Sequence, residues 1–135
     1  MAAVKPLRDV PYPSSPEAVE RNLDREATLA GRYFVEQYGL ARWDAERVEH
    51  TVAFAEQWSK EHHVPVYCGE FGVYRKYANP EDRTRWLKDM RVALEKHRIG
   101  WAMWDYQEGF GAVTKANGKT VPDQRVLDAL GLRAK

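Results

Sequence analysis

Apolar residues recur every three or four positions in three segments of the chain, a spacing that predicts amphipathic helices. The first helix is expected over residues 16–38, with Ser15 as its N-cap and Gly39 as its stop. The second is expected over residues 44–63, and the third over residues 80–98, after an Asn-Pro pair that is typical of a helix start. The apolar stripe of the first helix consists of Val19, Leu23, Ala27, Ala30, Phe34 and Tyr38.

Two shorter apolar runs, over residues 64–74 and 99–106, predict β-strands. Residues 109–122 are expected to form a polar loop that leads into a short helix over residues 123–130, and the proline-rich residues 1–15 an irregular arm. Strands that are separated by whole helices pair in parallel through right-handed crossovers. The pattern therefore predicts an α/β architecture.

Glu70 is the residue around which this pattern is organised, because it places an acid at the end of the first apolar run. Gly69 and Gly72 allow the backbone to pack closely on both sides of it. A carboxylate at the mouth of a strand is a candidate for catalysis. The alternative is a strand-end glutamate that faces solvent or pairs with an arginine.

The length of 135 residues suits a single domain, but two parallel strands with four helices cannot make a covered sheet. The chain is therefore predicted to be one unit of a larger barrel, whose missing strands come from an absent segment, a partner chain or copies of itself. A net charge of +1 argues against nucleic acid and anionic membranes as partners. Residues 1–4 lack the features of a signal peptide, and the single cysteine, Cys68, is expected to be a small buried strand residue.

The adjacent histidines His62 and His63 are not expected to bind a metal, because neighbouring helical residues point about 100° apart and no further ligand has the required spacing. No metal and no cofactor are expected for the chain.

The two predicted strands carry a pattern that resembles a known family. It consists of VPVYCGEFGVYR, a helix with the pair RW, IGWAMWDYQEGFGAV and a closing ALGL. This pattern is similar to the C-terminal part of the catalytic domain of glycoside hydrolase family 5, the cellulase or endo-β-1,4-glucanase group, whose members are (β/α)8 TIM barrels. The resemblance covers most of the chain, and GEFG followed by WAMWDY is its most specific feature.

The resemblance implies a retaining glycosidase that acts on β-linked glucan polysaccharides or oligosaccharides, in a secreted or periplasmic location. It assigns the catalytic nucleophile to Glu70 and the sugar-stacking tryptophan to Trp104, while Asp105 and Tyr106 are expected to bind sugar hydroxyls. The acid/base glutamate of the family follows an asparagine, and no Asn-Glu dipeptide occurs here. Hydrolysis by this chain alone is therefore left open.

Two alternatives remain at this point. About four copies of the chain could close a barrel as a homo-oligomer, which would bring several Glu70 side chains together. The chain could instead be an inactive fragment that acts at most as a carbohydrate-binding module through its aromatic residues. A single aromatic platform is not expected, because Trp101 and Trp104 point to opposite faces of a strand.

Overall fold

The computed structural model describes residues 7–26 and 28–132. Residues 1–6 of the predicted arm, and Ala27 of the first predicted helix, lie outside this range. The elements, in order, are α1 (Pro16–Arg25), α2 (Leu29–Ala41), α3 (Ala45–His62), β1 (Tyr67–Phe71), α4 (Pro80–Lys96), β2 (Gly100–Met103), β3 (Val113–Ala116), β4 (Lys119–Pro122) and α5 (Gln124–Ala129).

The predicted helix starts are confirmed by the caps. The side chain of Ser15 accepts a hydrogen bond from the Ala18 amide, and that of Asp44 caps α3 in the same way. The Asn79 side chain accepts from the amides of Glu81 and Asp82 at the start of α4. Each cap satisfies backbone N–H groups that have no partner inside the helix, so these boundaries follow from local sequence.

The single helix predicted over residues 16–38 is wrong, since the chain forms two helices there. Glu26 leaves the helical conformation, and its buried carboxylate accepts hydrogen bonds from the amide and hydroxyl of Thr28, the N-cap of α2. Gly39 is not the stop but lies inside α2, where an added Cβ would approach a methyl group of Val19 to 2.6 Å. The two helices therefore pack tightly against each other.

The parallel pairing of the two apolar runs is confirmed: β1 pairs with β2, with Tyr67 opposite Gly100 and Cys68 opposite Trp101. Both strands are shorter than predicted. Residues 64–66 lie outside the strand, and Val64 is held at the end of α3, where its amide donates to the Ser59 carbonyl and its carbonyl accepts from the Ser59 hydroxyl. Cys68 is only half-buried, although it packs against the core.

The polar loop predicted over residues 109–122 is only partly right, because β3 and β4 form an antiparallel hairpin within it. Its turn places Asn117 and Gly118 at positive φ, 51° and 76°. An Asn-Gly pair favours this two-residue hairpin turn, so the signal was present in the sequence. The short helix that follows is confirmed as α5, capped by Asp123.

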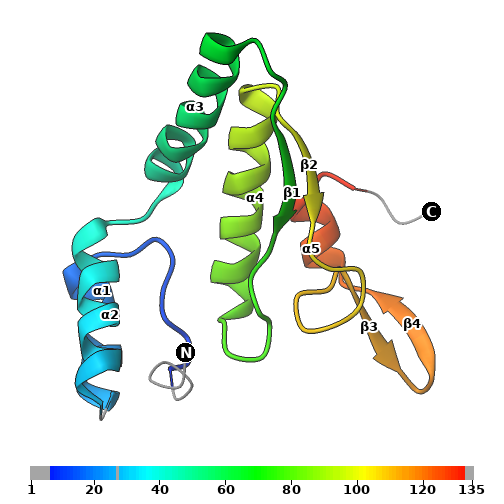
Figure 1. The fold of residues 1–135 in the computed structure, drawn as a ribbon. Helices are drawn as coiled ribbons and strands as arrows, with labels where there is room; N and C mark the ends of the chain where they lie inside the picture. The colour runs from blue at the N-terminus through cyan, green and yellow to red at the C-terminus, as the bar shows by residue number, and fades with distance from the viewer. Residues whose placement is uncertain (1–6, 27, 133–135) are drawn as a thin grey trace.

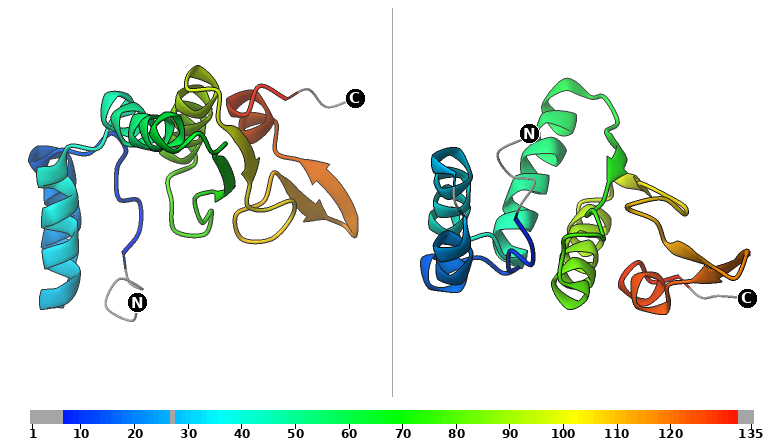
Figure 2. Two further views of the ribbon diagram at one scale, coloured as in Figure 1. Left: turned by 45° about the horizontal axis from the view of Figure 1, so that its top comes forward. Right: turned by 90° about the horizontal axis from the view of Figure 1, so that it is seen from below.

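Helices α3, α4 and α5 lie side by side along one side of the β1–β2 sheet (Figures 1 and 2). The β3–β4 hairpin extends beyond the carboxyl end of β2. Helices α1 and α2 form a separate pair at the opposite end of the molecule. The main core lies between α3, α4, α5 and the sheet; its buried members include Val52, Phe71, Leu87, Leu94 and Val126. In the described part of the chain, no helix has the length and apolar character required to cross a membrane.

Candidate active site

Glu70 lies at an irregularity of strand β1. Cys68 pairs with Trp101 and Phe71 pairs with Met103, so two residues of β1 stand opposite one residue of β2. Such a bulge changes the phase of the side chains along a strand and is frequent next to active sites. Here Phe71 turns into the core, whereas Gly69 and Glu70 are both exposed. The bulge thus leaves the Glu70 carboxylate open to solvent at the carboxyl end of β1.

Trp104 lies next to the end of β1, directly after strand β2. Its amide donates a hydrogen bond to the Phe71 carbonyl at 2.8 Å, and its peptide bond to Asp105 is cis. A Cβ added to Gly72 would lie 2.2 Å from the Trp104 carbonyl oxygen. The absence of a side chain at Gly72 therefore allows the two strand ends to approach this closely.

A hollow of about 530 Å³ connects these groups. Glu70 and Trp104 both line it, and Glu70 is the one acid among its described lining residues. Its remaining wall is mostly apolar and consists of Phe71, Gly72, Trp86, Met90 and Phe110. Trp104 is 51% exposed, so this aromatic residue is accessible in the hollow that Glu70 also lines.

The other two predicted site residues do not line this hollow. The Asp105 carboxylate accepts a hydrogen bond from the Glu108 amide at 2.8 Å, so it stabilises the turn after Trp104. Tyr106 is 66% exposed, and its carbonyl accepts from the Val113 amide. The structure therefore brings Glu70 and Trp104 together, and it places Asp105 and Tyr106 in the adjoining loop.

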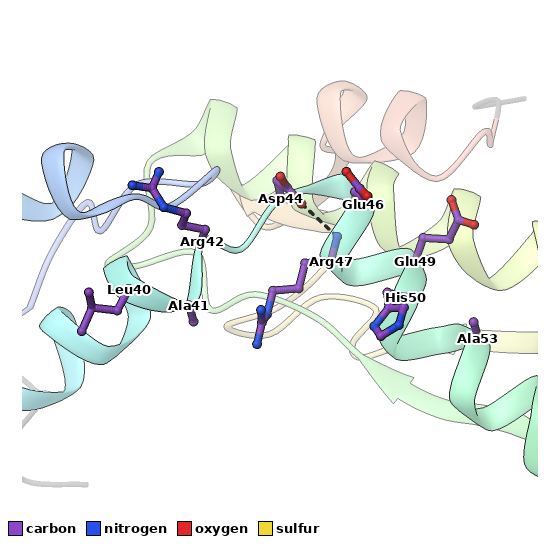
Figure 3. Close-up of a pocket in the computed structure, with 9 residues that line it drawn as sticks. All are labelled: Leu40, Ala41, Arg42, Asp44, Glu46, Arg47, Glu49, His50 and Ala53. Atoms are coloured by element: carbon purple, nitrogen blue, oxygen red, sulfur yellow. Dashed lines mark hydrogen bonds between the residues drawn. The ribbon is translucent and has the colours of Figure 1, made fainter.

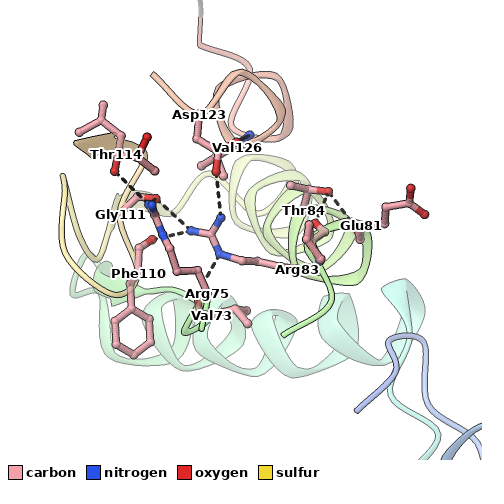
Figure 4. A network of polar contacts seen from close by, with 12 residues as sticks. Val73, Arg75, Glu81, Arg83, Thr84, Phe110, Gly111, Thr114, Asp123 and Val126 are labelled. Carbon is pink, nitrogen blue, oxygen red and sulfur yellow. Dashed lines mark hydrogen bonds and ion pairs between the residues drawn. The ribbon is translucent and has the colours of Figure 1, made fainter. Parts of the chain in front are cut away.

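Two arginines from the segment after β1 support the loop that follows Trp104 (Figure 4). The Arg75 guanidinium donates to the carbonyls of Gly111 and Val113. Arg83, which is only 4% exposed, donates to the Phe110 and Gly111 carbonyls, and burial lowers the pKa of its guanidinium. Sequence reasoning missed this role, because a helical arginine gives no sign of facing inward.

A second hollow, of about 720 Å³, lies at the corner between α2 and α3 (Figure 3). Its lining mixes acids such as Glu46 and Glu49 with Arg42, Arg47 and His50. Neither Glu70 nor Trp104 contributes to it, so it is a separate feature.

Among the described residues, no group of three or more His, Cys, Asp or Glu side chains is arranged to hold a metal ion. His62 stacks on Trp58 with 4.5 Å between ring centroids, and His63 is the C-cap of α3.

No protein-family model and no curated protein sequence matches the chain. Among solved structures, it is similar to the endoglucanase Cel5A of the hyperthermophile Thermotoga maritima, with 29% identity and a TM-score of 0.59 over 81% of this chain and 34% of that one. It is similar to cellulose synthase subunit Z of Clostridioides difficile, with 30% identity and a TM-score of 0.57 over 64% and 28% of the two chains.

A family 5 xyloglucanase from Paenibacillus pabuli shares the fold, with 21% identity and a TM-score of 0.57 over 70% of this chain and 29% of that one. The chain thus spans about a third of the length of the solved proteins that it matches. These similarities confirm the resemblance to family 5 glycoside hydrolases and the prediction of a partial barrel.

Proposed function

We propose that this chain, which has the fold of part of a family 5 glycoside hydrolase, carries the nucleophile of a retaining β-glucanase. The observation that supports the proposal is the shared hollow of Glu70 and Trp104, where the strand bulge exposes one carboxylate and a half-exposed tryptophan lines the same hollow. Barrel enzymes hold their chemistry at this end of the strands.

Glu70 is proposed to attack the anomeric carbon of a sugar that rests on Trp104. The carboxylate oxygen forms a bond to that carbon while the bond to the leaving oxygen breaks, which gives a glycosyl-enzyme ester. Water then cleaves the ester and restores the carboxylate. The apolar C–H face of a pyranose suits the flat ring of Trp104.

A retaining mechanism also needs a second carboxylic acid about 5–5.5 Å from the nucleophile, to protonate the leaving group. Among the described residues that line the hollow, Glu70 has no such companion. We therefore propose that the acid/base comes from another segment or chain that completes the barrel. Since general acid catalysis contributes about 10²–10⁴-fold, hydrolysis of unactivated glucan by this chain alone should be at least that much slower.

The proposed substrates are β-linked glucans. Structures of the Thermotoga maritima enzyme are described as complexes with cellobiose and with mannotriose, and the first shares 32% identity with this chain. Both ligands are hexose oligomers, whose pyranose rings an indole face can accommodate. The bonds that Asp105 and Tyr106 are predicted to make to sugar hydroxyls remain part of this proposal.

The test is covalent trapping, which does not depend on the missing acid. A fluorinated aryl cellobioside with an activated leaving group needs no protonation to react, and its fluorine slows hydrolysis of the ester. We expect intact-mass and peptide mass spectrometry to find one added fluorocellobiosyl group, on Glu70, and to find none in Glu70→Gln. Glu81→Gln, at the start of α4 and outside the hollow, is the matched control and should label like the wild type.

Labelling that persists in Glu70→Gln, or rapid degradation of the unactivated polymer that this substitution leaves intact, would contradict the proposal. Light scattering on the same sample would reveal a homo-oligomer that completes the barrel.

A carbohydrate-binding role without hydrolysis is the second candidate, and the open faces of Trp104 and Tyr106 favour it. It predicts that cello-oligosaccharides bind the chain, that Trp104→Ala weakens the binding, and that no ester forms on Glu70. Unchanged affinity in Trp104→Ala would exclude this role for the hollow.

A further inference from the structure

Arg83 is a charged side chain from helix α4 that ends in the interior, between the two loops that flank the Glu70–Trp104 hollow (Figure 4). It is only 4% exposed. A buried guanidinium is costly unless its donors are satisfied, and these donors are directed at backbone carbonyls and one carboxylate. The positions of these acceptors indicate what Arg83 does in the fold.

The acceptors come from three separate parts of the chain. Nε donates to the Val73 carbonyl at 3.0 Å, in the loop that follows Glu70. Nη2 donates to the carbonyls of Phe110 at 2.6 Å and Gly111 at 3.0 Å, in the loop that follows Trp104. Nη1 forms an ion pair at 3.6 Å with Asp123, the N-cap of α5. One planar group thus ties the end of β1 to the loop after β2.

Both tied loops reach the hollow. Val73 follows Gly72, against whose Cα the carbonyl oxygen of Trp104 lies, and the Phe110 ring is part of the wall. A displacement of either carbonyl would therefore move Trp104 or Phe110 relative to Glu70. Arg83 itself does not line the hollow.

We propose that Arg83 is a positioning residue that sets the distance between Glu70 and Trp104 by clamping the two loops, with Asp123 holding its third side. This inference deepens the function proposed above and rests on it for its relevance to sugar chemistry. The clamp itself is a property of the fold and can be tested without sugar. A lysine cannot replace it, because one ammonium group cannot reach carbonyls on both loops and a carboxylate in the planar geometry of a guanidinium.

The test is fluorine NMR of the full chain labelled with fluorotryptophan, which gives one signal for each of the five tryptophans. Trp104→Phe and Trp86→Phe assign the signals from the hollow, whereas Trp43 and Trp58, near and within α3, serve as internal references. Arg83→Lys is the main variant. Arg85→Lys is its matched control, since Arg85 lies on the same helix but bonds the Tyr12 carbonyl and Asp82 instead.

We expect Arg83→Lys to melt cooperatively and to shift or broaden the Trp104 signal, while the reference signals and the Arg85→Lys spectrum stay as in the wild type. In Arg83→Ala, added guanidinium chloride at low millimolar concentration should restore the Trp104 signal, and sodium chloride should not. This rescue would not be expected if the residue merely filled space.

A wild-type Trp104 signal in folded Arg83→Lys and Arg83→Ala would overturn the proposal. Loss of the cooperative melt in Arg83→Lys would also contradict it, because the inferred effect is confined to the two loops. If the clamp is confirmed but no ester forms on Glu70 in the trapping experiment, the proposed function fails and the positioning role stands.

Discussion

Gly72→Ala is expected to separate the two strand ends that form the site. The new Cβ would lie 2.2 Å from the Trp104 carbonyl oxygen, more than an ångström inside the 3.4 Å at which ordinary van der Waals contact begins. Because the obstacle is backbone rather than a flexible side chain, the Trp104 segment must move away. Overpacking of this kind costs about 1–3 kcal/mol.

The movement also disturbs the hydrogen bond from the Trp104 amide to the Phe71 carbonyl, which adds about 1 kcal/mol. The expected loss of about 2–4 kcal/mol corresponds to a fall of roughly 10 °C in Tm for a chain of this size. The measurement is thermal denaturation followed by circular dichroism, with Trp104 monitored by fluorine NMR.

Gly69→Ala is the matched control, because it makes the same substitution three residues earlier, within β1, whereas Gly72 directly follows that strand. No atom lies within 4 Å of the Cβ that it adds, so stability should change by no more than about 0.5 kcal/mol. Equal melting temperatures for the two variants would refute the reasoning that Gly72 is required by its contact with Trp104.

Two further predictions concern charge and pH. The Tyr12 hydroxyl donates to Asp89 at 2.8 Å, and burial, together with this bond, raises the pKa of Tyr12. Because tyrosine in the unfolded chain ionises near pH 10, the stability that Tyr12 contributes should be lost as pH rises above about 10. Urea titrations should therefore show a smaller loss of stability at high pH in Tyr12→Phe than in the wild type. The hydrogen bond from Lys60 is the largest cause that lowers the pKa of Glu56, so the stability from this group is present above its unfolded pKa and lost as pH falls through the folded one. The loss of stability below about pH 4 should therefore be less steep in Glu56→Gln than in the wild type. Identical pH profiles would show that this ion pair does not contribute to stability.

Local sequence was sufficient for most helix boundaries. Asp44 and Asn79 cap their helices through bonds to amides only two or three residues away, so nothing distant is needed to recognise them. The helix break at Glu26 was not predicted, because the apolar spacing continues through it. At this break the buried Glu26 carboxylate accepts hydrogen bonds from Thr28, the N-cap of the next helix, and burial is set by packing.

The hairpin of β3 and β4 is a different case, since its Asn-Gly turn is a local signal that the polar composition of the segment obscured. The strand ends differ again. Residues 64–66 favour a strand by composition, but hydrogen bonds to Ser59 hold Val64 in the turn after α3. The β-strand preference of these residues is therefore outweighed by the hydrogen bonds at the end of α3.

For the site, the sequence by itself determined the residue types: a glutamate after one apolar run and a tryptophan after the next, in an order that resembles family 5. Only the tertiary structure decided how they meet. The bulge at Glu70 depends on the register between two strands, the approach of Gly72 to Trp104 depends on their parallel pairing, and the bonds of Arg83 to Phe110 and Gly111 join residues 27 and 28 positions apart. Such contacts arise from the packing of distant segments, and no local pattern of residues encodes them.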